Sequence, residues 1–133
     1  MKTIKIILIY LCFFSANTML MAQSAEIPAE IVSALDNGSA AQINAHLSAN
    51  VELVIGNKND VFSKQQASGI INEFFQSVKV QSFQVIHKGN KDTASFAIGT
   101  LKTTSGSYRV YVLTRKQGAT SLIQQLRIES SNE

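Results

Sequence analysis

The chain has 133 residues, of which 45% are hydrophobic and 16% are charged, and it contains one cysteine. This length supplies one domain with a core of its own and not two. The formal net charge is +3 and falls to +1 if Lys2 and Lys5 are removed by processing. So small a charge cannot make the many phosphate contacts of a nucleic-acid-binding protein, and we expect no nucleic-acid partner.

The N-terminal region has the pattern of a signal peptide. Two lysines lie in the first five residues, Ile6–Phe14 is an unbroken apolar run, and after Ser15–Thr18 a short patch ends in the small residue Ala22. We predict cleavage before Gln23, which leaves residues 23–133 as one periplasmic or secreted domain and removes Cys12. The alternative is a membrane anchor, but a spanning helix needs about 20 apolar residues. We therefore expect no stable membrane insertion after cleavage.

Two short helices are predicted next. Pro28 suits the first turn of a helix, which the pair Asn37–Gly38 would end. A second helix begins after Ser39, whose hydroxyl starts a capping-box pattern. The apolar stripe of this helix would consist of Ile43 and Leu47.

A hairpin and a long helix follow. Residues 51–55 have the composition of a strand, and residues 61–62 begin a short return strand. Ser63 and Gln66 repeat the capping-box pattern and start a helix that reaches about Val78. The broad apolar stripe of this helix would pack across a sheet. It consists of Ala67, Ile70, Ile71, Phe74 and Phe75.

The rest of the chain reads as four strands, over residues 82–88, 93–103, 107–115 and 121–129. Short turns with glycine separate most of them, which predicts consecutive antiparallel hairpins. Helices and strands that occur in runs, without alternation, indicate an α+β fold.

This order of elements resembles the nuclear transport factor 2-like (cystatin-like) fold, and more narrowly an exported bacterial family of unknown function. The segments that carry the likeness, between Ile27 and Glu129, are IPAEIVSAL, VELVI, FQVIHKG, AIGTL, YRVYVL and LIQQLRIE. The resemblance implies a cone in which three N-terminal helices, with a short β-hairpin before the third, pack on a curved antiparallel sheet. It also implies a conical cavity and often a dimer through the sheet, but no activity.

No catalytic constellation can be recognised. The ketosteroid isomerases that the fold resembles place an acid on the first strand, where this chain has Leu53. Glu52 is one residue away and would point to the opposite face of the strand. The two histidines, His46 and His87, lie far apart and have no further ligand at helical spacing, so we expect no metal site and no cofactor.

Three polar side chains are candidates for binding a ligand. Alternation along the strands places Tyr108 and Gln124 on faces they share with apolar residues, and places His87 on the face of Phe83 and Val85. If these faces line the cavity, the three side chains would contact a small apolar ligand. The alternative for His87 is an ordinary strand-end histidine that is hydrogen-bonded to a neighbour.

The opposite faces of the last two strands carry a different set of residues. Arg109, Tyr111, Gln125 and Arg127 combine charge, amide and aromatic groups. Tyrosine and arginine commonly anchor protein interfaces, so this set predicts a homodimer or another protein contact through the sheet. The alternative is an ordinary solvated sheet face.

These observations favour a non-catalytic module of the bacterial envelope that binds a small ligand or another envelope protein. A purely structural partner of an envelope protein shares the same sequence features. The alternative is an isomerase or lyase that uses the cavity, with His87 or Glu52 as proton carrier and Tyr108 as donor.

Overall fold

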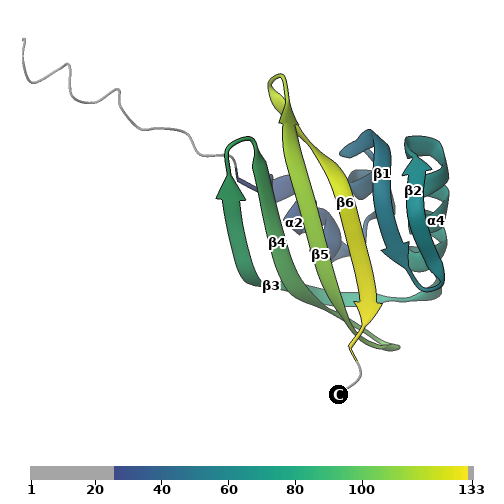
Figure 1. The fold of residues 1–133 in the computed structure, drawn as a ribbon. Coiled ribbons are helices and arrows are strands. Elements are labelled where there is room, and N and C mark those ends of the chain that lie inside the picture. Colours follow the sequence, from purple (N-terminus) through teal and green to yellow (C-terminus); the bar gives the residue numbers. More distant parts are fainter. Residues whose placement is uncertain (1–25, 132–133) are drawn as a thin grey trace, which may run out of the picture.

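The computed structural model describes residues 26–131, which form a curved six-stranded sheet with three helices on one side (Figure 1). The predicted signal peptide, residues 1–22, and Cys12 lie outside the described residues. The helices are α2 (Ala29–Asn37), α3 (Ala40–Asn44) and α4 (Lys64–Ser77). The strands are β1 (Leu47–Ile55), β2 (Lys58–Ser63), β3 (Val80–Lys91), β4 (Ala94–Thr103), β5 (Gly106–Gln117) and β6 (Thr120–Ser130).

The strand order is β2-β1-β6-β5-β4-β3. All neighbours are antiparallel except β1 and β6, which are parallel, so the prediction of a fully antiparallel sheet was wrong. The cause is α4, which carries the chain back so that β3 runs in the direction of β2. Three hairpins later β6 runs opposite to β3 and therefore parallel to β1.

The predicted start and end of the first helix are confirmed. Pro28 precedes α2, and Gly38 ends it in the left-handed region with φ of 65°. Glycine adopts this conformation without strain, and a larger residue there would also meet Val80, whose Cγ2 lies 2.9 Å from an ideal Cβ. The helix α2 packs against β3.

The second helix is shorter than predicted. The Ser39 hydroxyl accepts a hydrogen bond from the Gln42 amide at 3.3 Å, as expected for a cap, but α3 ends at Asn44 and Leu47 begins β1. His46, directly before β1, already contacts the sheet, because its carbonyl accepts a hydrogen bond from the Ile123 amide at 2.7 Å. Leu47 is fully buried in the strand, and it would also be buried in a helix. Apolar spacing alone therefore could not decide whether Leu47 belongs to a helix or to a strand.

The long helix begins as predicted. Ser63 and Gln66 make both hydrogen bonds of a capping box, and α4 extends to Ser77. Its buried residues, Ala67 and Ile71, face the sheet, and α4 contacts β1, β2 and α3. None of the helices within residues 26–131 is long and apolar enough to cross a membrane.

The core lies between the helices and the inner face of the sheet. Its largest side chains with almost no exposed surface are Ile31, Leu35, Ile43, Leu47, Val51, Leu53, Ile71, Leu101, Val110, Ile123, Leu126 and Ile128. The other side of the sheet, which we call the open face, has no helix against it within the described residues.

Candidate functional site

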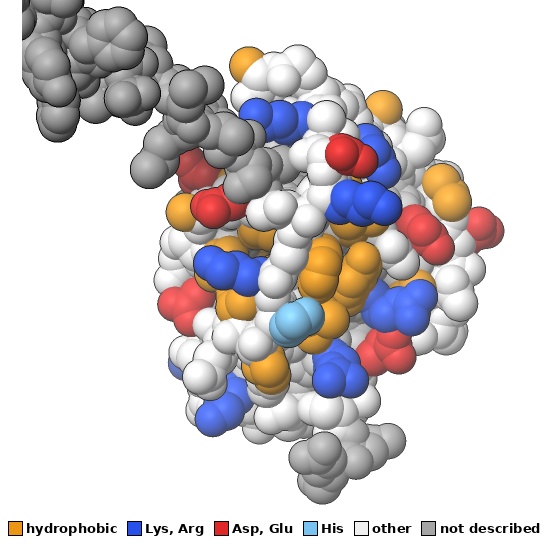
Figure 2. Space-filling view, turned by 60° about the vertical axis from the view of Figure 1, so that its left-hand side comes forward, with side chains coloured by type: hydrophobic (Ala, Val, Ile, Leu, Met, Phe, Trp, Pro, Cys, Tyr) orange, Lys and Arg blue, Asp and Glu red, His pale blue; other side chains and the backbone are white. Residues whose placement is uncertain are grey.

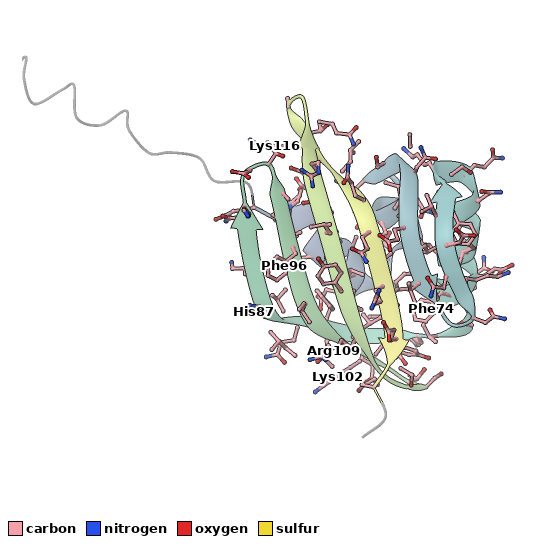
Figure 3. The ribbon with its side chains drawn as sticks, in the orientation of Figure 1. Phe74, His87, Phe96, Lys102, Arg109 and Lys116 are labelled. Carbon is pink, nitrogen blue, oxygen red and sulfur yellow. The ribbon has the colours of Figure 1, made fainter. Side chains whose placement is uncertain are left out.

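The four residues predicted as an interaction set lie together on the open face. Tyr111 pairs with Arg127 in the β5–β6 register, and Gln125 pairs with Leu113. With Arg109, which Figure 3 labels, these side chains line one shallow hollow of about 540 Å³. Ile98 of β4 and Glu129 of β6 complete its lining.

A row of rings extends this set toward the edge of the sheet. The ring of Phe96 stacks on Tyr111 with 6.1 Å between centroids, and His87 lies 5.8 Å from Phe96 on its other side. Gly89 makes room for Phe96, because a Cβ at that glycine would lie 2.6 Å from the phenyl ring. Cross-strand aromatic contacts of this kind stabilise a sheet and fix its register.

The sequence analysis missed Phe96 and Ile98. Along β4 these residues alternate with the buried Ser95, Ala97 and Gly99, so the period-two pattern contained the signal.

The open face combines apolar and charged side chains. Ile86 at one side has 64% of its surface exposed, and Val61 on β2 has 61% exposed. Figure 2 shows apolar side chains gathered beside a histidine, with basic and acidic side chains around them.

Both acidic and basic side chains occur on this face. Arg127 Nε lies 3.3 Å from Glu129 Oε1, with both side chains about half exposed, so this ion pair adds little to stability. Arg109 pairs with Glu129 in the strand register and makes no ion pair within residues 26–131. Glu52 on β1 is exposed beside Gln125, and its neighbour Leu53 is fully buried, as strand alternation predicted.

The predicted face of His87 was wrong. Val85 pairs with Gly99 and His87 pairs with Ile98, so a bulge at Ile86 shifts the register by one residue. The alternation is broken there, and His87 lies on the open face against Phe96.

A second bulge moves Gln124. On β5 the consecutive residues Leu113 and Thr114 pair with Gln125 and Ile123, which leaves Gln124 as the extra residue of β6. Its Oε1 accepts a hydrogen bond from Arg115 Nε at 3.2 Å. Gln124 therefore does not share the face of Leu126, and the predicted alternation along β6 was wrong.

The three candidate ligand-binding residues are consequently not brought together. Tyr108 is on the inner face, where its ring meets Phe74 of α4 edge to face at 5.2 Å. His87 and Gln124 are on the open face, on strands β3 and β6. His46 is half-buried at the end of α3, with its ring Nδ1 2.9 Å from the Gln42 carbonyl oxygen. Within residues 26–131 no three His, Cys, Asp or Glu side chains gather closely enough to hold a metal ion.

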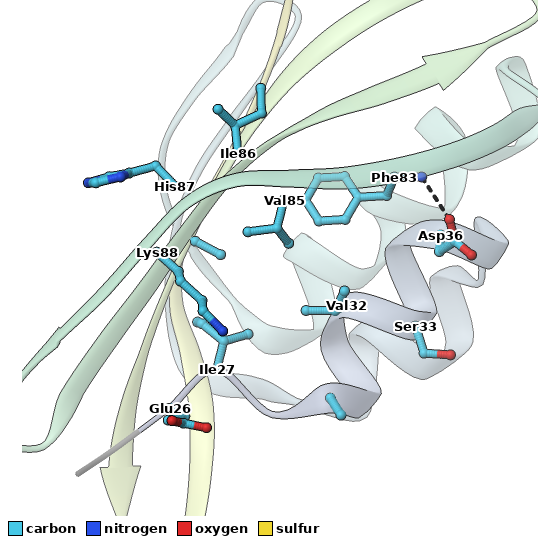
Figure 4. A pocket seen from close by; sticks show the side chains of 12 residues that line it. Glu26, Ile27, Val32, Ser33, Asp36, Phe83, Val85, Ile86, His87 and Lys88 are labelled. Atoms are coloured by element: carbon cyan, nitrogen blue, oxygen red, sulfur yellow. Dashed lines mark hydrogen bonds between the residues drawn. The ribbon is translucent and has the colours of Figure 1, made fainter.

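A separate groove of about 850 Å³ opens between α2 and β3 (Figure 4). Apolar side chains from both elements line it, including Val32, Phe83 and Val85, and Glu26 and Lys88 also border it. The Phe83 amide donates a hydrogen bond to Asp36 Oδ1 at 2.8 Å, which fixes the end of α2 to β3. Phe83, Val85 and His87, which the sequence analysis expected beside a cavity, all border this groove. Its other wall, α2, was not predicted, because its place depends on β3 being the last strand of the sheet.

Comparison with known proteins agrees with this architecture. The family model described as Domain of unknown function (DUF4783) matches residues 28–129. The structure of a DUF4783 family protein from Bacteroides ovatus is 38% identical, with a TM-score of 0.76, and the match covers 80% of this chain and 97% of that one. No curated protein matches the chain in sequence.

More distant structures share the fold alone. A domain of unknown function with a cystatin-like fold from Nostoc punctiforme has a TM-score of 0.62 at 9% identity, covering 78% of this chain and 72% of that one. A protein of the Rd1NTF2 series has a TM-score of 0.61 at 14% identity, covering 74% and 90%.

Proposed function

This chain belongs to the DUF4783 family, and we propose that it is a non-catalytic interaction module of the bacterial envelope that binds protein through its open face. The observation that carries this proposal is the uncovered row of Phe96, Ile98 and Tyr111 with arginines beside it. Aromatic residues and arginine are enriched at the centres of interfaces, where they supply most of the binding free energy.

The partner we propose is a second copy of the chain. The open face carries Arg109 and Arg127 together with Glu52 and Glu129, so basic and acidic side chains lie side by side on it. In a two-fold dimer the same patch meets itself, and a patch that contains both signs can pair its bases with the acids of its partner. A face of one sign would repel its own copy.

The envelope location is part of the proposal and rests on the predicted signal peptide in residues 1–22. Export would remove the only cysteine together with this segment. A chain without thiols suits an oxidising compartment.

We advance no second, catalytic function. The residues considered as proton carrier and donor were His87, Glu52 and Tyr108. Tyr108 contacts Phe74 below the sheet, while the other two lie on the open face, on strands β3 and β1. Acid–base catalysis needs such groups within hydrogen-bond reach of one substrate.

Sedimentation velocity over a range of protein concentrations tests the proposal. We expect the wild-type chain to dimerise and Tyr111→Ala or Arg109→Ala to raise the dimer Kd about 30-fold, the effect of losing about 2 kcal/mol at an interface anchor. Lys64→Ala is the matched control, because it removes an exposed cation at the start of α4. A wild-type chain that stays monomeric would contradict the second copy as partner. Unchanged dimer mass in both open-face variants would exclude this face.

A further inference from the structure

The strand β3 is an uncovered edge beside a groove. It is the last strand of the sheet, and only β4 pairs with it within the described residues. The backbone groups on the outer side of an edge strand have no strand partner and can template another chain. Proteins normally restrict this by covering the edge or by occupying its donors.

One outward donor of β3 is already occupied by a side chain. Because the Phe83 amide binds the Asp36 carboxylate, it points away from β4. The register is regular from Phe83 to Val85, so the amide two residues further on points the same way. The Val85 amide therefore faces outward at the groove, beyond the reach of β4.

The groove has the shape and lining for alternate side chains of an added strand. Val32 of α2 forms one wall, and Phe83 and Val85 of β3 form the other (Figure 4). At its rim the bulge leaves Ile86 largely exposed. An extended peptide along this edge would place every second side chain in the groove and satisfy the Val85 amide with a carbonyl group.

We infer that the outer edge of β3, with the groove between α2 and β3, binds an extended, uncharged peptide segment as an additional strand. An extended peptide supplies both backbone acceptors for the edge and apolar side chains for the groove. Glu26, Asp36 and Lys88 border the same groove, but the Asp36 carboxylate is held by the Phe83 amide and most of the lining side chains are apolar, so apolar side chains of a peptide fit it best. This inference goes beyond the proposed function, because dimerisation through the open face does not use the outer edge of β3.

The probe is a capped seven-residue peptide of alternating valine and threonine, N-methylated at every second amide. The methyl groups prevent its aggregation and leave one edge free to pair. The control is the same peptide methylated at every amide, which retains the side chains, lacks all backbone donors and carries methyl groups on both edges that keep its carbonyl groups away from β3. Binding to the purified full chain is measured by calorimetry and by backbone amide shifts in NMR spectra.

We expect the first peptide to bind and to shift the amides of Phe83, Val85 and Lys88, while the amides of β2, the opposite edge of the sheet, stay unchanged. Equal binding of both peptides would overturn strand addition, because the side chains alone would then suffice. Absence of binding by the first peptide would overturn the inference altogether.

Two variants separate the edge from the groove. Val85→Pro removes the outward donor without removing a ladder bond to β4, and we expect about tenfold weaker binding, as for loss of one hydrogen bond. Val32→Lys obstructs the groove from α2 and leaves the edge intact, with a loss of similar size expected. If Val85→Pro does not fold, Val32→Lys and the amide shifts decide. Unchanged peptide affinity in folded Val85→Pro would overturn the role of the strand edge, and unchanged affinity in folded Val32→Lys would overturn the role of the groove.

Discussion

Ser95 of β4 and Thr114 of β5 lie opposite each other on the inner face of the sheet, with their hydroxyl oxygens 2.8 Å apart. Ser95 is 2% exposed and Thr114 is completely buried. The Ser95 hydroxyl therefore depends on Thr114 for its hydrogen bond, whereas the Thr114 hydroxyl can also donate to the Ser95 carbonyl oxygen, 3.4 Å away. The inner face contains few other polar side chains, so the pair is a specific point of alignment between two strands.

The pair predicts non-additive effects on stability. Ser95→Ala should lower the free energy of unfolding by about 1–3 kcal/mol, because it leaves the buried Thr114 hydroxyl with a poorer partner. The double variant Ser95→Ala/Thr114→Val removes both polar groups and should cost less than the sum of the single changes. Urea denaturation of the wild type, the two single variants and the double variant measures the coupling energy between the hydroxyls. Additive changes in the free energy of unfolding would show that the two hydroxyls are independent.

Two glycines predict opposite outcomes for the same substitution. A Cβ at Gly99 would lie 2.5 Å from the Gln84 carbonyl oxygen and 2.6 Å from the Phe83 ring, so Gly99→Ala should destabilise the chain by about 1–3 kcal/mol. Gly69 lies in α4 with open space around it, so Gly69→Ala should stabilise the chain by about 0.5–1 kcal/mol. Thermal unfolding followed by circular dichroism compares the two. Equal shifts in Tm would contradict the difference in packing.

The contact between Asp36 and the Phe83 amide predicts a local effect. Asp36→Ala should lower the free energy of unfolding by about 1–3 kcal/mol and accelerate hydrogen exchange of the Phe83 amide. Asp36→Asn retains a carbonyl acceptor, so its free energy of unfolding and its exchange rate at Phe83 should lie between those of Asp36→Ala and the wild type. Exchange at Phe83 that is equally slow in all three proteins would show that another group protects this amide.

The capping box at the start of α4 gives a prediction about helix stability. Ser63→Ala removes the acceptor for the Gln66 amide and should lower stability by about 1 kcal/mol. Ser68→Ala in the same helix is the control, since Ser68 is not at a cap. A comparable loss in both variants would attribute the effect to serine in general.

Local signals predicted where the helices α2 and α4 begin and where α2 ends. Pro28, Gly38 and the Ser63–Gln66 box act within a few residues, so the sequence around them contains the whole interaction. The faces of β5 were also predicted, because Tyr108, Val110 and Val112 alternate without interruption with Arg109 and Tyr111. This alternation is why Arg109 and Tyr111 were correctly placed on one face as part of the interaction set.

Features that depend on pairing between distant segments could not be predicted. A bulge adds one residue to a strand and reverses every later alternation, which is why His87 and Gln124 were assigned to the wrong faces. The parallel neighbours β1 and β6 and the contact of Asp36 with Phe83 depend on sheet order, which local patterns do not contain. Leu47 is apolar and buried in either a helix or a strand, so its spacing did not decide between them.

The position of β6 between β1 and β5 has a consequence for how the chain reaches its native state. Leu53 is paired with Leu126, so the middle of the sheet joins an early segment to the last strand of the chain. A polypeptide that emerges N-terminus first has β1 and β5 without their common neighbour until residues 120–130 follow. Because contacts between such distant segments form slowly, the core closes only at the end of synthesis. A chain truncated before Thr120 would expose two interior strand edges at once, and we expect it to aggregate.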